Sequence, residues 1–249
     1  MNLYGLVGYP LGHSFSKRFF TNKFENEGLG YCHFELLPLK SIQEFPKLVS
    51  DNPTLKGLAV TIPYKQAIIP FLNNISPEAA KIGAVNCIQF LGGKLKGFNT
   101  DVVGFEKSFL PLLQPHQKKA LVLGTGGASK AVQYILEKCS IPFTLVSRLE
   151  DTSKGILNYA SVTQQVLREH LIVINCSPVG MAPNEQLKPA IPYEFLTNQH
   201  FLYDLVYGLT ETAFLMEGRS RGAIVKDGYE MLVLQAEENW RVWNSLITP

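Results

Sequence analysis

A buried strand that runs into a glycine-rich turn is the feature that most limits how this 249-residue chain can fold. Ala120-Leu121-Val122-Leu123 is an uninterrupted apolar run, typical of a parallel strand that is covered on both faces. A cluster of glycines follows at once, before an expected helix over Ala131–Glu137 and an expected strand over Phe143–Ser147. Strand, helix and strand within about 30 residues form a βαβ unit. The sequence therefore predicts an α/β fold with a parallel sheet.

The turn itself has the pattern of a phosphate-binding site. Glycines allow a tight passage from strand to helix, and the unpaired N–H groups at the start of a helix attract a phosphate. Gly124 and Gly126 take the first two positions of the dinucleotide-binding fingerprint, whereas Ser129 stands where a third glycine or an alanine is usual. We interpret the turn as a dinucleotide site. A tight turn without a ligand is the alternative.

The end of the next strand bears on the choice of dinucleotide. An arginine at this place binds the 2′-phosphate of NADP, whereas an acidic residue bonds the ribose 2′-hydroxyl of NAD. The strand ends in Ser147-Arg148, which favours NADP. Glu150, two residues further on, leaves NAD possible.

Polar side chains follow the expected strands of the N-terminal half. Strands are expected over Leu3–Gly8, His33–Leu37 and Gly57–Ile62, with a hairpin over Ala84–Phe90 and Lys94–Gly97. The polar side chains near their ends are those of Ser14, Ser16, Thr61, Lys65, Asn86 and Asp101. Open α/β sheets bind ligands at the carboxyl ends of their strands, so this set predicts a small polyhydroxylated ligand.

Each of these polar residues also has a simpler interpretation. Thr61 and Asp101 are suited to capping helices, and Asn86 to a turn. Pro63 is suited to the first position of a helix, which would place Lys65 on the first turn of that helix.

Composition excludes several classes of protein. The chain has 23 Lys and Arg against 21 Asp and Glu, a net charge of +2, so we expect no nucleic-acid partner. Hydrophobic residues make up 46% and charged residues 18%, which excludes a disordered chain. The four cysteines are far apart, and the five histidines form no metal-binding pair, so we expect reduced thiols and no metal site. With no signal-peptide pattern and no apolar run of about 20 residues, we expect a cytoplasmic protein without a membrane partner.

Taken together, the motifs resemble the shikimate dehydrogenase family over almost the whole chain. The matching segments, in the family's order and spacing, are Gly8–Ser16, Val60–Lys65, Gly83–Asn86, Asn99–Asp101, Gly124–Ser129, Asn175–Met181, Tyr203–Tyr207 and Gln235. Three departures bear mainly on the cofactor. Ser147-Arg148-Leu149 replaces the family's Asn-Arg-Thr, Gly208-Leu209 replaces Asn-Pro, and Pro77 stands where an acidic residue is common.

The resemblance implies a role for each matching residue. Lys65 and Asp101 would form the catalytic dyad. The residues that would bind the substrate are Ser14, Ser16, Thr61, Asn86, Tyr207 and Gln235. The residues that would bind the cofactor are Gly124, Thr125, Gly126, Gly127, Ala128, Ser147, Arg148, Leu205 and Gly228.

The resemblance also implies a two-domain α/β architecture. Residues 1–102 plus 227–249 would form an α/β substrate-binding and catalytic domain, to which the C-terminal helix, expected over Glu230–Leu246, returns. Residues 103–226 would form a Rossmann-like, doubly wound NADP-binding domain.

The expected activity is the reversible NADP-linked reduction of 3-dehydroshikimate to shikimate in aromatic amino acid (chorismate) biosynthesis. Three alternatives remain. A quinate/shikimate dehydrogenase would use NAD or both cofactors, as Glu150 would allow. A non-catalytic nucleotide-binding relative would need a broken dyad, and a folate-linked dehydrogenase fits poorly with the paired serines and with Gln235.

Overall fold

The computed structural model describes residues 1–12, 14–208 and 210–245. The chain divides into two compact units. Unit 1 comprises Met1–Thr100 and Gln235–Pro249, and unit 2 comprises Asp101–Leu234. Three residues of the segments discussed above, His13, Leu209 and Leu246, lie outside the described residues. The functional boundaries expected from the sequence, 1–102 plus 227–249 and 103–226, stay a prediction.

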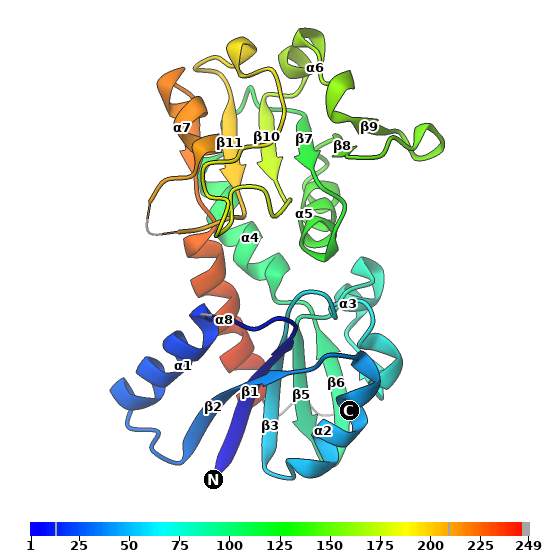
Figure 1. The fold of residues 1–249 in the computed structure, drawn as a ribbon, viewed down its shortest axis with the longest axis vertical. Helices are drawn as coiled ribbons and strands as arrows, with labels where there is room; N and C mark the ends of the chain where they lie inside the picture. Colours follow the sequence, from blue (N-terminus) through cyan, green and yellow to red (C-terminus); the bar gives the residue numbers. More distant parts are fainter. Residues whose placement is uncertain (13, 209, 246–249) are drawn as a thin grey trace. The chain divides into compact units, whose positions relative to one another are not determined.

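Unit 1 is built on a six-stranded sheet in the order β2-β1-β3-β5-β6-β4 (Figure 1). Its strands are β1 (Asn2–Gly8), β2 (Cys32–Pro38), β3 (Leu55–Val60), β4 (Asn74–Ile75), β5 (Cys87–Leu91) and β6 (Lys94–Phe98). β1 pairs in parallel with β2 and β3, whereas β5 is antiparallel to both β3 and β6. Gly92 and Gly93 both have positive φ, as the expected tight hairpin turn requires. The sheet is therefore mixed rather than largely parallel.

Two layers of helix cover the sheet of unit 1. Its helices are α1 (Phe15–Asn26), α2 (Phe45–Asp51), α3 (Pro77–Ile82) and the part of α8 (Tyr229–Asn244) from Gln235 onward. On one face, Phe45 of α2 and Ala79 of α3 join a buried aliphatic core that contains Val7. On the other face, Phe20 of α1 and Trp243 of α8 pack around Tyr4 and Phe34. Alternation along β1 thus sends Tyr4 to one layer and Val7 to the other.

The end of α8 is fixed to the sheet by packing and by hydrogen bonds. The indole of Trp243 lies directly on the backbone of β3, where Gly57 leaves room for it. A Cβ atom added at Gly57 would lie 2.4 Å from Trp243 Cδ1. The buried amide of Gln89 donates to the carbonyl oxygens of Val242 (2.6 Å) and Ser245 (2.7 Å) at the end of the helix.

We expect Gly57→Ala to lower the free energy of unfolding by roughly 1–3 kcal/mol, because the new methyl group overlaps a buried ring that has little room to move. Urea denaturation measures the change. Gly30→Ala is the matched control, since a Cβ at this exposed glycine meets no atom within 4 Å. Equal stability of the two variants would contradict the tight approach of Trp243 to β3.

Unit 2 is built on a sheet of six parallel strands in the order β12-β11-β10-β7-β8-β9. These strands are β7 (Ala120–Leu123), β8 (Phe143–Ser147), β9 (Ile156–Asn158), β10 (Ile172–Asn175), β11 (Phe201–Asp204) and β12 (Ile224–Lys226). From β9 to β12 the sheet has the strand order 3-2-1-4-5-6 of the doubly wound dinucleotide-binding fold. The expected Rossmann-like architecture is confirmed.

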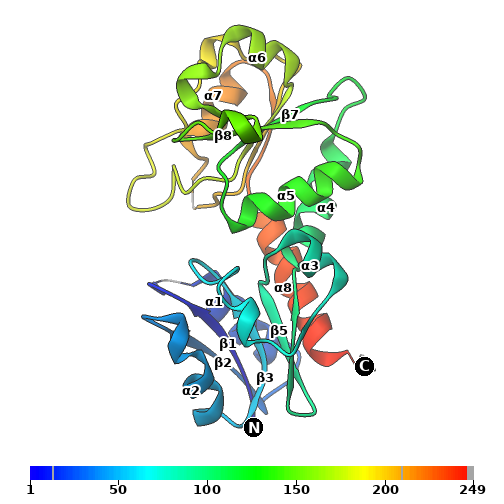
Figure 2. The ribbon, with the colours of Figure 1, turned by 90° about the vertical axis from the view of Figure 1, so that its right-hand side faces the viewer.

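Helices cover both faces of this second sheet. They are α4 (Asp101–Phe109), α5 (Gly127–Lys138), α6 (Gln164–Glu169) and α7 (Ala213–Ser220). Helices α4 and α5 lie side by side (Figure 2), and Phe109 of α4 stacks on Phe201 of β11. Leu167 of α6 and Phe214 of α7 belong to the core on the opposite face.

Several local expectations from the sequence are wrong. Pro63 begins no helix, because residues 61–68 form turns, so Lys65 lies in a turn. A strand is expected over Phe201–Tyr207, but β11 ends at Asp204, whose carboxylate accepts from the N–H of Val206, so Tyr207 lies beyond the strand. α5 starts at Gly127 rather than Ala131, since the glycine-rich segment itself supplies the first turn of the helix. Among the described residues, no helix combines the length and the apolar character needed to cross a bilayer.

Candidate functional site

Strand register gathers the polar residues of unit 1 at one edge of its sheet. Val7 pairs with Val60, Ala59 with Cys87, and Cys87 with Phe98. The carboxyl ends of β1, β3 and β6 therefore meet the amino end of β5. Thr61 follows β3, Asn86 precedes β5, and Asn99-Thr100 follows β6, so these three positions lie along a single edge.

Asn86 is held rigidly in the middle of this edge. Its side chain is buried, and its Oδ1 accepts from the backbone N–H of Thr100 at 2.6 Å. Its Nδ2 donates to Thr100 Oγ1 at 3.0 Å. Its backbone N–H donates to the carbonyl of Phe98, and its carbonyl accepts from Val60. Asn86 thus bridges β3 and β6, which gives it a structural role in addition to the expected binding role.

Helix α8 joins the same network and places Gln235 in it. Thr100 Oγ1 donates to Asn239 Oδ1 at 2.7 Å, and Asn239 Nδ2 donates to Gln235 Oε1 at 3.3 Å, one turn earlier on α8. All three side chains are buried. Gln235, more than 130 residues from Asn86 in the sequence, is therefore brought to the same polar network. Sequence reasoning identified Gln235 but missed the linking roles of Thr100 and Asn239, because only tertiary pairing joins them.

The remaining expected residues of unit 1 lie in the loops and at the helix start that follow the strands. Ser14 is the N-cap of α1, where its hydroxyl accepts from the N–H of Lys17, and Ser16 is on the first turn. Thr61 is tied to β1 by its N–H, which donates to the carbonyl of Val7 at 2.8 Å. The carbonyl of Lys65 accepts from Val85 at 2.7 Å, which fixes the backbone of that turn beside the segment leading to Asn86.

Asp101 lies on the other side of the division between the units. It is buried and is the first residue of α4, directly after Thr100. The expected dyad thus has Lys65 in unit 1 and Asp101 in unit 2. A carboxylate in the first turn is favoured by the N-terminal end of a helix.

The glycine-rich turn of unit 2 has the geometry that a dinucleotide needs. Gly124 has φ +110°, and a Cβ on it would lie 3.1 Å from the backbone of Cys176 and Ser177 at the end of β10. Gly126 is the N-cap of α5 and has no atom within 4 Å of the place that a Cβ would take. The first glycine therefore allows the tight turn, and the second leaves open space in front of the start of the helix, as binding of a pyrophosphate requires.

Ser129, at the third fingerprint position, is fully buried between α5 and β10. Its side chain hydrogen-bonds with the thiol of Cys176, and its Oγ accepts from Gln133 Nε2 at 2.9 Å. Burial raises the pKa of the Cys176 thiol well above its ordinary value, so this cysteine stays neutral. A serine fits here because its hydroxyl finds partners on both sides, and the helix keeps its close packing on the strand.

The end of β8 carries the expected residues for cofactor choice on the surface. Arg148 and Glu150 are both exposed in the β8–β9 loop, after Ser147. The carboxylate of Glu150 accepts from Asn158 Nδ2 at 3.3 Å, which holds it towards β9. Arg148 is close enough to Tyr159 to lower the pKa of that phenol, although burial raises it more strongly.

Leu205, Tyr207 and Gly228 lie after β11 and β12. A Cβ on Gly228 would lie 2.3 Å from the carbonyl oxygen of Leu205, so only glycine allows the two segments to touch. Tyr207 is 39% exposed, in the loop that follows β11. The structure thus brings Leu205 and Gly228 together at one end of the sheet of unit 2.

A buried carboxylate organises this end of the sheet. Asp204 accepts from Asn175 Nδ2 (2.8 Å), from the N–H of Val206 (3.0 Å) and from Thr212 Oγ1 (2.6 Å). Burial raises the pKa of Asp204 to about 6, although these donated bonds act to lower it. Asp204 is therefore mostly ionised at neutral pH. Sequence reasoning gave Asp204 no role of its own, although it stands within the Tyr203–Tyr207 motif.

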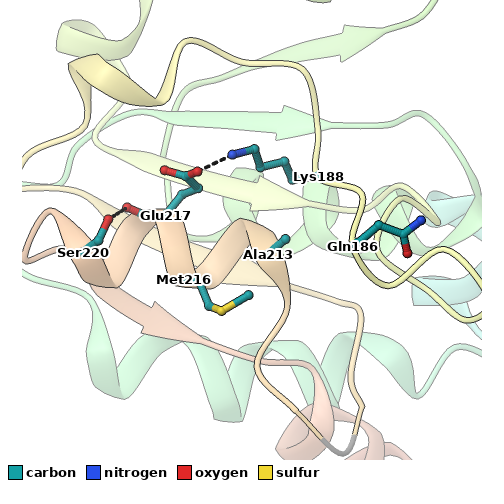
Figure 3. A pocket seen from close by; sticks show the side chains of 6 residues that line it. All are labelled: Gln186, Lys188, Ala213, Met216, Glu217 and Ser220. Carbon is teal, nitrogen blue, oxygen red and sulfur yellow. Dashed lines mark hydrogen bonds and ion pairs between the residues drawn. The ribbon is translucent and has the colours of Figure 1, made fainter.

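Two surface hollows of unit 2 are lined by none of the expected site residues. One, of about 320 Å³, is lined by Gln186, Lys188, Ala213, Met216, Glu217 and Ser220 (Figure 3). An ion pair between Lys188 and Glu217 crosses it. No expected site residue lines this hollow. The described part of the chain also contains no group of three or more His, Cys, Asp or Glu placed to hold a metal ion.

We expect Ser14→Ala to lower the free energy of unfolding by about 1 kcal/mol, because the variant loses the N-cap acceptor of α1. Ser16→Ala is the control, since Ser16 is past the cap, and its effect should stay within about 0.5 kcal/mol. Urea denaturation of both variants separates capping from any role in binding. Equal losses would contradict the assignment of Ser14 as the cap.

Comparisons with known proteins agree on one family. Residues 6–88 match the family model described as the shikimate dehydrogenase substrate binding domain. A protein of Halothermothrix orenii named shikimate dehydrogenase (NADP(+)) is 36% identical over 264 residues, which cover 97% of this chain and 90% of that protein.

Two solved structures extend the likeness to the fold. The crystal structure of shikimate 5-dehydrogenase from Thermus thermophilus, in complex with NADP(H) and shikimate, has a TM-score of 0.86 at 29% identity, covering 100% of this chain and 95% of that chain. Quinate dehydrogenase from Corynebacterium glutamicum, in complex with NAD, also has a TM-score of 0.86, at 26% identity, covering 98% of this chain and 94% of that chain.

Proposed function

Because this chain belongs to the shikimate dehydrogenase family, we propose that it catalyses the reversible NADP-linked reduction of 3-dehydroshikimate to shikimate. The observation that carries the proposal is the single polar edge of unit 1. Register and α8 bring Thr61, Asn86 and Gln235 to that edge, and the turn with Lys65 is fixed beside it. Hydroxyl, amide and ammonium groups are suited to a ligand with several ring hydroxyls.

Each side chain takes the role that the resemblance to the family implies. Thr61, Asn86 and Gln235 bond the ring hydroxyls of the substrate, and Ser14, Ser16 and Tyr207 bind its carboxylate region. Because Asn86 and Gln235 are already held by Thr100 and Asn239, they are oriented before substrate arrives. Such preorganisation lowers the entropy lost on binding. Unit 1 serves as the substrate domain, with Asp101 supplied by the first residue of unit 2.

The residues of unit 2 fit NADP. Gly124 to Ala128 form the turn and the N-terminal end of α5, where open space at Gly126 admits the pyrophosphate. Ser147 and Arg148 hold the adenosine 2′-phosphate, and Leu205 with Gly228 lines the opposite end of the site. When bound, NADPH supplies the hydride.

The protein must also donate one proton to the substrate during reduction and accept it in the reverse direction. Reduction of the ketone needs a proton at the new hydroxyl oxygen, and Lys65 donates it from its ammonium group. In the reverse direction Lys65 accepts the proton. Asp101 holds the ammonium by charge and completes the dyad. The protein works in the cytoplasm on a small-molecule substrate, in the pathway to aromatic amino acids.

We expect the purified protein to reduce NADP when given shikimate. We also expect Lys65→Ala to lower kcat by ~10²–10⁴-fold, the usual contribution of a general acid–base group, and to leave KM little changed. Steady-state kinetics test both. Lys56→Ala is the matched control, since Lys56 is an exposed lysine on β3, the strand that leads to Thr61. No turnover by a folded wild-type sample would overturn the function. A normal kcat in Lys65→Ala would show that Lys65 only binds.

We expect Arg148→Ala to raise the KM for NADP about tenfold or more and to leave NAD unaffected. A charge-assisted bond to the 2′-phosphate contributes roughly 1.5–3 kcal/mol, and about 1.4 kcal/mol is a factor of ten. Kinetics with both cofactors measure the change, with the exposed Arg168→Ala on α6 as control.

The same assay distinguishes the quinate/shikimate alternative. The carboxylate of Glu150 is engaged with Asn158, so it leaves the 2′-phosphate position to Arg148. A higher kcat/KM for NAD than for NADP in the unmodified enzyme would show that Glu150 governs the pocket and would favour that alternative.

A further inference from the structure

The loop after β11 is pinned at both ends by one side chain. Its described residues, 205–208 and 210–212, include Tyr207. At the start of the loop, Asp204 Oδ1 accepts from the N–H of Val206 at 3.0 Å. At the end, Asp204 Oδ2 accepts from Thr212 Oγ1 at 2.6 Å. The carboxylate therefore links the backbone of Val206 to the side chain of Thr212, which lies eight residues after Asp204 in the sequence.

Both members of this second bond are buried and oriented by other partners. Asp204 is 0% exposed and Thr212 is 7% exposed. Thr212 Oγ1 also accepts from the N–H of Leu215, as the N-cap of α7, so its own proton is directed to Asp204. A hydrogen bond between a buried carboxylate and a hydroxyl is among the stronger ones in proteins.

Asp204 is in turn fixed from β10. Asn175 Nδ2 donates to Asp204 Oδ1 at 2.8 Å. Asn175 Oδ1 accepts from the N–H of Ser177 at 3.0 Å and from its Oγ at 2.7 Å, so the amide cannot rotate without losing both bonds. The carboxylate thus has a defined position before it holds the loop.

We propose that the Asp204–Thr212 hydrogen bond positions Tyr207 and thereby sets the affinity for the carboxylate region of the substrate. Tyr207 lies between Val206 and Thr212, the two positions that Asp204 holds. Joining the ends of a loop reduces the number of conformations that it must lose on binding. Asp204 and Thr212 are positioning residues that act through Tyr207. This inference rests on the proposed function.

The test uses the full-length enzyme with Thr212→Val, which keeps the shape of the side chain but removes the hydroxyl. We expect the Kd for shikimate, measured by calorimetry, to rise roughly tenfold, as does its KM, because a bond to a charged group is lost. The KM for NADP should stay within about twofold. Thr212→Ser keeps the hydroxyl and should restore the shikimate affinity. Thr212→Ala replaces the valine variant if the latter does not fold.

Thr163→Val is the matched control for loss of stability. Thr163 is the N-cap of α6 in the same unit, and its hydroxyl accepts from Val166 at 3.4 Å, the length of the cap bond of Thr212. Thermal unfolding should show a loss in both variants, larger in Thr212→Val because it also loses the bond to Asp204, but only Thr212→Val should weaken shikimate binding.

A double-mutant cycle with Tyr207→Phe separates positioning from general weakening. If Thr212 acts through Tyr207, Thr212→Val should add less than about a twofold loss in the Tyr207→Phe background. Fully multiplicative losses, an unchanged shikimate Kd in Thr212→Val, or an equal rise in the KM for NADP would each overturn the inference. A wild-type enzyme with no shikimate turnover would instead overturn the proposed function.

Discussion

The register of four strands decides where the chemistry of unit 1 can lie. Val7 is opposite Val60, and Cys87 is opposite both Ala59 and Phe98, so two parallel strand ends and a hairpin meet along one line. A shift by one residue would turn every side chain of a strand to the other face. Such a shift would also break the backbone bonds by which Asn86 joins Val60 and Phe98. The aliphatic core on one face and the aromatic layer on the other thus protect the geometry of the polar edge.

The buried polar groups at that edge do not destabilise the fold, because they form hydrogen bonds with one another. An unpaired buried amide costs about 1–3 kcal/mol, so Asn86, Thr100 and Asn239 each need a partner. The chain supplies those partners from three distant segments. This arrangement makes α8 part of the site as well as part of the core. The helix that places Trp243 against Gly57 therefore also carries Asn239 and Gln235 to the network of Asn86.

The sequence predicted what depends on neighbouring residues and missed what depends on tertiary partners. The apolar run of β7, the glycine turn and the hairpin of β5 and β6 were predictable, because each has a local cause. The helix expected to begin at Pro63 is wrong, because a proline is as compatible with a turn as with the start of a helix. Thr100 and Asn239 gave no signal as linking residues, because 139 residues of sequence separate them.

In unit 2, neighbouring side chains compensate for a departure from the dinucleotide-binding fingerprint. The third fingerprint position requires close helix-to-strand packing, and a hydroxyl there would be buried without a partner in an apolar site. Cys176 and Gln133 supply partners for Ser129, so the glycine turn keeps its approach to β10. No such compensation is needed at Leu149, which is exposed on the β8–β9 loop. The buried departure is therefore constrained by its neighbours in the fold, whereas packing places no such constraint on the exposed one.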